Sequence, residues 1–94
     1  MRNATIDILD DLKEAKGLES DYKLAKLLEV RQQTVSNYRN KRTQMTDEIA
    51  CRAARMLGRH PGAILAQLAG ERAKDTQVAK VWFEMAKQLA KSAR

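Results

Sequence analysis

Apolar residues recur at spacings of three and four along most of this chain, which is the period of an amphipathic helix. No segment alternates apolar and polar residues as a half-buried strand does. The residues that most often interrupt helices are scarce, with 4 Gly and 1 Pro among 94 residues. The pattern therefore predicts an all-α fold.

The first half of the chain is expected to hold three helices. The first covers about residues 5–16 and ends at Gly17, the second follows the N-cap Ser20, and the third runs from Arg31 or Gln32 to near Asn40. The apolar stripe of the first comprises Ile6, Leu9, Leu12 and Ala15. The inward residues of the other two are Leu24, Ala25, Leu27, Leu28, Val35 and Tyr38.

The second half is expected to hold three more helices. The fourth follows Thr46 and ends at Gly58, and the fifth runs from Pro61 to about Leu68 or Gly70. The buried face of the fourth comprises Ile49, Ala50, Ala53, Ala54 and Leu57. A sixth helix, over about residues 71–92, carries a separate apolar stripe. We therefore divide the chain into a domain of residues 1–70 and a C-terminal helical element in residues 71–94.

Composition and charge narrow the class of protein. A hydrophobic fraction of 44% and a charged fraction of 32% are typical of a folded, soluble chain. The first residues carry acids where a signal peptide is apolar, no apolar run could cross a membrane, and a single Cys suits a reducing compartment, so a cytoplasmic location is expected. The net charge of +6 is uneven: −2 over residues 1–30, +5 over residues 31–60 and +3 over residues 61–94. Basic proteins of this size often bind nucleic acid.

The positive region begins with the segment "EVRQQTVSNYRNKR", residues 29–42. On a helical wheel, amide and hydroxyl side chains cluster opposite the inward residues, namely Gln32, Gln33, Ser36, Asn37 and Asn40. An amide offers a donor and an acceptor in one plane, which matches the major-groove edge of adenine. Cations flank this face where phosphates would lie: Arg31, Arg39, Lys41 and Arg42. An ordinary solvated helix is the alternative, but such helices usually carry Glu and Lys, which this face lacks.

The stretch "YKLAKLLEVRQQTVSNYRNKR" resembles the helix-turn-helix of the Cro/lambda-repressor-like family, also called XRE. The similarity continues through "IACRAARMLGRHPGAIL" and covers roughly residues 5–68. The resemblance implies a five-helix lambda-repressor-like DNA-binding domain with its helix-turn-helix at about residues 21–40. Small stand-alone proteins of this kind are similar to regulators of bacteriophages and mobile elements.

The resemblance also implies roles for single residues. Bases would be read by Gln32, Gln33, Ser36 and Asn37. The DNA backbone or groove wall would be contacted by Thr34, Arg39, Asn40, Lys41 and Arg42, in addition to Arg31 from the helical wheel. Ser20 would cap the second helix, whose N-terminus would point its amides at a phosphate.

Three positions depart from the family pattern. Glu29 stands where a turn Gly is common, and Lys41 stands where a Gly often follows the family's Asn. If these positions need positive φ, each substitution costs on the order of 1 kcal/mol. Asp21 stands where a neutral polar residue often contacts phosphate, and an acid there would repel DNA.

The residue types that carry catalysis or bind metals are sparse. His60 and Cys51 are the only His and Cys, whereas a metal site needs about three or four ligands close in space. We expect His60 to cap a helix before Pro61 and Cys51 to act as a small packing residue. No phosphate-binding Gly-rich loop, acid pair or nucleophile–base pair is evident, so neither an enzyme nor a bound cofactor is expected.

The sixth helix raises the question of assembly, because half of the aromatic residues, Trp82 and Phe83, are adjacent within it. The stripe expected to form a dimer interface comprises Val78, Val81, Trp82, Met85 and Leu89. The alternative is that Trp82 packs back on the five-helix core. A dimer would place two reading helices on two half-sites and so increase the affinity.

The sequence therefore predicts a sequence-specific transcriptional regulator, with repression as the expected direction, that binds a pseudo-palindromic operator in double-stranded DNA as a homodimer. Two alternatives remain open. A protein-interaction module on the same fold would capture a host or phage protein through the C-terminal helix, which Asp21 and the acids of the first helix favour. An antitoxin-like or recombination-accessory protein would bind DNA and a partner protein together.

Overall fold

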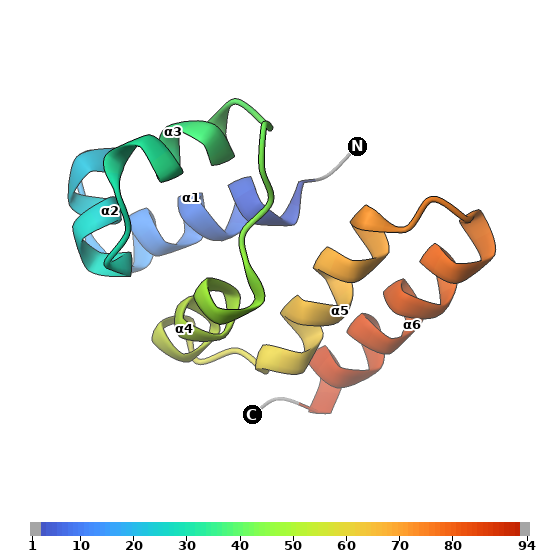
Figure 1. Cartoon of the computed structure of the whole chain (residues 1–94). Helices are drawn as coiled ribbons and strands as arrows, with labels where there is room; N and C mark the ends of the chain where they lie inside the picture. Colours follow the sequence, from blue (N-terminus) through green and yellow to red (C-terminus); the bar gives the residue numbers. More distant parts are fainter. Residues whose placement is uncertain (1–2, 93–94) are drawn as a thin grey trace.

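The computed structural model describes residues 3–92, and all regular structure within them is helical (Figure 1). The helices are α1 (Ala4–Lys16), α2 (Asp21–Leu28), α3 (Gln32–Arg39), α4 (Asp47–Leu57), α5 (Pro61–Arg72) and α6 (Thr76–Ser92). The radius of gyration, 13.1 Å, is that of a compact domain of about this length. The predicted all-α class is confirmed. None of the helices in residues 3–92 has the length and apolar character needed to cross a lipid bilayer.

Local sequence signals set most helix ends as predicted. The side chains of Ser20 and Thr46 accept hydrogen bonds from backbone N–H groups in the first turns of α2 and α4. Gly17 and Gly58 end α1 and α4 in the left-handed conformation, with φ of 62° and 68°. Asn3 supplies a similar N-terminal cap to α1, which begins at Ala4 rather than at Thr5.

The main core lies among α1 to α5. Its fully buried large apolar side chains are Leu9, Leu12, Leu24, Leu28, Val35, Met45 and Leu68. The predicted stripe of α1 was partly wrong, because Ile8 is buried while Ile6 is half-buried and Ala15 is exposed. The reason is that residues spaced by three drift by about 60° per step around a helix, so Ile6 and Ala15 cannot both share one face with Leu9 and Leu12. Leu27 and Leu57, predicted to be inward, are half-buried at the edge of this core.

The boundary between the last two helices differs from the prediction. Helix α5 continues to Arg72, so Glu71 belongs to α5, and α6 begins only at Thr76. Asp75 explains this start, since its Oδ1 accepts hydrogen bonds from the N–H groups of Gln77 at 2.8 Å and Val78 at 3.1 Å.

Helix α6 runs antiparallel to α5 and contacts no other helix of the described chain (Figure 1). Small residues form the contact: Ala66 and Gly70 of α5 and Ala86 of α6 are buried, although none belongs to the main core. The ring of Phe83 lies directly over Gly70, where an added Cβ would be 2.4 Å from its Cε1 atom. Trp82 keeps 36% of its surface exposed and is not part of the five-helix core. Thus α6 is an appendage held by α5 alone.

Candidate nucleic-acid interface

Helices α2 and α3 are joined by a tight turn of residues 29–31. Glu29 ends α2 in the left-handed conformation, with φ of 60°, and the N–H of Val30 donates to the carbonyl of Ala25 at 3.0 Å. Arg52 of α4 closes the end of α2 by donating to the carbonyl oxygen of Leu28. These contacts fix the direction in which α3 leaves α2.

The inward side of α3 is held by Val35 and Tyr38, both buried as predicted. The Tyr38 hydroxyl hydrogen-bonds the backbone of Thr46, and burial raises the pKa of Tyr38 above its ordinary value despite that bond. After α3, Lys41 adopts φ of 60°, and the N–H of Arg42 donates to the carbonyl of Asn37 at 2.9 Å. Both positions where the family pattern has Gly therefore need the left-handed conformation.

The outward side of α3 carries the predicted polar face. Four of its side chains are exposed, namely Gln32, Gln33, Ser36 and Asn40. Its fifth side chain, Asn37, is half-buried, as is Thr34, which was predicted to contact the DNA backbone or groove wall. The Nε2 of Gln33 donates to Oδ1 of Asn37 at 3.1 Å, and the Nδ2 of Asn40 donates to Oγ of Ser36 at 3.4 Å. Because each pair spans one helical turn, the amides orient one another and still keep hydrogen-bonding capacity for a partner.

The start of α3 is open. Arg31 precedes the helix in an extended conformation, and no side chain caps the N–H groups of the first turn. Such groups suit an anion, because the N-terminal end of a helix carries partial positive charge.

Three predicted backbone-contacting cations are exposed around this face: Arg31, Lys41 and Arg42. Within residues 3–92 none of them makes an ion pair with an acid. They could therefore approach phosphates without first breaking an internal contact.

Arg39, the fourth predicted cation, is placed differently. Its Nε and Nη2 donate to the two carboxylate oxygens of Asp21, each at 3.1 Å, and its Nη1 donates to Asp10. Lys13 adds a 3.3 Å contact to Asp21. This cluster, which we call the Arg39 network, joins α1, α2 and α3 beside the polar face.

The Arg39 network shifts the titration of its members. Partial burial would raise the pKa of Asp21, but hydrogen bonds and charges from Arg39 and Lys13 outweigh it and lower the pKa below the ordinary value of 3.8. Burial would likewise lower the pKa of Arg39, and contacts with Asp21 and Asp10 raise it instead. Asp21 is therefore a neutralised acid rather than an isolated negative charge facing the solvent.

Reasoning from sequence missed this network because its members are far apart. Asp10 and Asp21 precede Arg39 by 29 and 18 positions, and no local spacing relates them. The one available signal was the departure of Asp21 from the family pattern, since a partly buried acid is usually paired with a nearby cation.

The two singled-out residues of the metal-ligand type lie apart from this face. His60 caps α5, with Nδ1 accepting from the N–H of Gly62 at 2.9 Å, as predicted. Cys51 is a half-buried free thiol on α4. Among residues 3–92, His, Cys, Asp and Glu form no group of three or more that could hold a metal ion.

The predicted dimerisation stripe is carried by α6, which lies on the opposite side of the molecule from α3 (Figure 1). Val78, Val81 and Met85 of α6 are 47%, 59% and 45% exposed. Trp82 is 36% exposed, and Leu89 is half-buried against Gly62. We call Val78, Val81, Trp82 and Met85 the outer α6 face, an apolar surface whose residues are each 36–59% exposed within residues 3–92.

Comparison with known protein families, with curated protein sequences and with solved structures finds no match to this chain.

Proposed function

We propose that the protein is a sequence-specific DNA-binding regulator of transcription, a cytoplasmic repressor with a lambda-repressor-like fold, in which α2 and α3 act as a helix-turn-helix. The observation that carries the proposal is the polar face of α3, where amides are paired and exposed while Val35 and Tyr38 hold the opposite side. Surface helices usually owe their solubility to Glu and Lys, which this face lacks. Oriented amides, in contrast, match the donors and acceptors on base edges.

In this proposal α3 lies in the major groove of double-stranded DNA. The base-reading residues are Gln32, Gln33, Ser36 and Asn37, and the Gln33–Asn37 pair presents a preset donor and acceptor array. Arg31, Lys41 and Arg42 contact phosphates, and Thr34 and Asn40 line the groove wall. We assign Arg39 a positioning role within the Arg39 network, in place of the phosphate contact first expected of it.

The regulator acts as a homodimer in this proposal. The outer α6 face supplies an apolar surface that a second copy can cover, and a two-fold axis there would give two α3 helices for a pseudo-palindromic operator. Exposed apolar patches of this kind on small monomers usually mark an interaction site.

A salt series of DNA titrations tests the proposal. Three phosphate-contacting cations per protomer predict that log K falls with log salt with a slope of roughly −5 for the dimer. Changing Lys41 and Arg42 to Gln should make the slope shallower by about one unit per lost cation in each protomer.

A matched control changes two cations of α6, Lys80 and Lys91, to Gln, which should leave the slope unchanged. If the chain shows no salt-dependent DNA binding, the regulator proposal fails and a protein-interaction module takes its place.

A further inference from the structure

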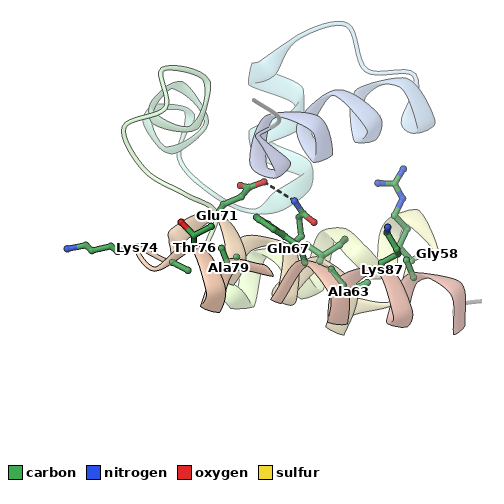
Figure 2. A pocket seen from close by; sticks show the side chains of 15 residues that line it. Gly58, Ala63, Gln67, Glu71, Lys74, Thr76, Ala79 and Lys87 are labelled. Carbon is green, nitrogen blue, oxygen red and sulfur yellow. Dashed lines mark hydrogen bonds between the residues drawn. The ribbon is translucent and has the colours of Figure 1, made fainter. Parts of the chain in front are cut away.

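A groove of about 930 Å³ runs along α5 and α6 (Figure 2). Gly58 and Arg59, which follow α4, also line it. Ala63 and Gly70 of α5 lie at its base, and Ala79, Phe83 and Ala90 of α6 form one wall. We call this the α5–α6 groove. It lies on a different side of α6 from Val81 and Met85, which do not line it.

The dimensions of the α5–α6 groove suit a helix. From Ala79 to Ala90, α6 rises about 16 Å, or three helical turns. The groove is lined mainly by apolar surface, and most of its wall residues are small. Small residues let a third helix approach two antiparallel helices closely, since interaxial distances of about 8–10 Å depend on side-chain size at the contact.

The charges around the groove are not balanced. The one acid of the lining, Glu71, is held by neutral donors, since its Oε2 accepts from the N–H of Ala4 at 2.9 Å and from Gln67 at 3.3 Å. Figure 2 shows these two α5 side chains hydrogen-bonded to each other, whereas Lys74 and Lys87 stand at opposite ends. Neither lysine has an acidic partner in residues 3–92. The groove thus has a mainly apolar lining with one acid, Glu71, and an unpaired cation at each end, so its cations outnumber its acids.

We propose that the α5–α6 groove docks an acidic amphipathic helix of another protein. The apolar stripe of that helix would cover Ala63 and Phe83, and acids at its two ends would meet Lys74 and Lys87. The inference depends on the packing of α5 and α6 and not on the proposed DNA-binding role.

A second copy of this chain is a poor occupant for the groove. The helix with the most acids, α1, has its apolar face in the main core. The polar residues beside the exposed apolar stripe of α6 are Gln77, Lys80, Glu84 and Gln88, so a second α6 would bring a single acid and not one at each end. Charge therefore favours a different protein.

Such a partner would affect how firmly α6 is held. Among the described helices α6 contacts only α5, and an occupant of the groove would contact both helices. Helix α6 also carries the outer α6 face. An occupied groove would therefore bias the position of the proposed dimer element, and this one consequence rests on the proposed function, in which a change at the dimer element alters DNA affinity.

Two labelled peptides of about 14 residues, long enough for the three turns of the groove, provide the test. Both carry the same Leu and Ala stripe at helical spacing, and one has Glu at both ends while the other has Lys. Fluorescence anisotropy with the full chain should show saturable binding of the acidic peptide, and binding of the basic peptide at least about tenfold weaker.

Charge reversal locates the site. Lys74→Glu combined with Lys87→Glu should weaken the acidic peptide by about tenfold or more, whereas Lys80→Glu combined with Lys91→Glu should change it less than about twofold. Circular dichroism checks that each variant remains helical. NMR shifts on adding peptide should concentrate at Ala63, Ala79 and Phe83.

Three results would overturn the proposal: no saturation up to about 200 μM peptide, equal losses in both double variants, or shifts concentrated at Val81 and Met85. DNA titration of the same samples separates the two proposals. Peptide binding without DNA binding would reject the regulator and keep the groove, and the reverse result would reject the groove alone.

Discussion

The Arg39 guanidinium donates two hydrogen bonds, each of 3.1 Å, to the two carboxylate oxygens of Asp21. This pair connects the last residue of α3 to the first residue of α2, and the contact with Asp10 extends it to α1. Bidentate pairs have a more defined geometry than single surface ion pairs. The pair therefore fixes how α3 is oriented on the rest of the domain.

Asp21→Asn should reduce the free energy of unfolding by about 1 kcal/mol at pH 7, because Arg39 then keeps its charge without a full partner. The folded-state pKa of Asp21 is lowered below its ordinary value of 3.8. A lowered pKa contributes stability above the unfolded pKa, and that contribution is lost as the pH falls through the folded pKa. Urea unfolding should thus show the difference from wild type intact down to about pH 4 and shrinking below it.

The control for this experiment is Glu19→Gln, which removes an exposed pair with Lys23 and should change stability by only a few tenths of a kcal/mol. A wild-type advantage over Asp21→Asn that stays constant down to about pH 2 would show that ionisation of Asp21 is not its source.

Glu29→Gly should stabilise the protein, because Glu29 holds φ of 60° and glycine adopts this conformation without a Cβ penalty. The expected gain is roughly 0.5–1 kcal/mol, partly offset by the greater freedom of glycine in the unfolded chain. Chemical unfolding measures this gain in the free energy of unfolding. Glu29→Ala keeps the Cβ and should give no gain, so equal effects of Gly and Ala would reject conformational strain as the cause.

Lys41→Gly should change protein stability and DNA affinity in opposite directions. Lys41 also holds φ of 60°, so the change should stabilise the fold by roughly 0.5–1 kcal/mol. If Lys41 contacts a phosphate, the same variant should bind DNA more weakly and lower the salt slope by about one unit per protomer. Stabilisation without any change in the salt slope would show that Lys41 does not contact a phosphate.

Gly70→Ala should destabilise the packing of α6, against the usual preference of helices for Ala over Gly. An added Cβ would lie 2.4 Å from Cε1 of Phe83, so the ring and α6 must move. Overpacking of this kind costs about 1–3 kcal/mol, which exceeds the helix gain of about 1 kcal/mol.

The matched control is the double variant Gly70→Ala with Phe83→Leu, whose smaller side chain leaves room for the new methyl group. A double-mutant cycle from urea unfolding should give a favourable coupling of about 1 kcal/mol or more. Additive effects would mean that Gly70 and Phe83 do not meet in solution.

Helix ends were largely predictable from sequence because their signals are local. Ser20, Thr46, Gly58 and His60 each act on a backbone group within a few residues, and each lies where the sequence placed it. The end of α5 was missed because no Gly or cap marks it, and the helix stops at Arg72 only shortly before Asp75 starts α6.

Features set by distant contacts were not predictable from spacing alone. The partners of Arg39 come from α1 and α2, which precede it in the sequence by many positions. The ring of Phe83 can lie over Gly70 only because glycine has no side chain, and a glycine at this position leaves no signal in the apolar periodicity. The polar face of α3 was predictable, since its inward residues Val35 and Tyr38 are strongly apolar on a short helix.

Val81→Glu should prevent dimerisation if the outer α6 face is the subunit interface, because Val81 is 59% exposed and a charge there would be buried on association. Sedimentation velocity should show a dimer for wild type at tens of micromolar and a monomer for the variant. Lys91→Glu places the same charge on the polar side of α6 and should remain dimeric. A wild type that stays monomeric would contradict the homodimer.

Base reading by α3 is tested most directly by selecting the duplexes that the protein binds from a random pool. The selected duplex and a scrambled version of it are then titrated with the protein. Wild type should select a pseudo-palindrome and bind it at least about 10³-fold more tightly than the scrambled duplex. Gln33→Ala should lose roughly 1–3 kcal/mol per protomer on the selected duplex and almost nothing on the scrambled one, whereas Gln77→Ala, at an exposed amide of α6, should lose nothing on either. No enriched sequence, or equal behaviour of the two Gln variants, would contradict base reading by α3.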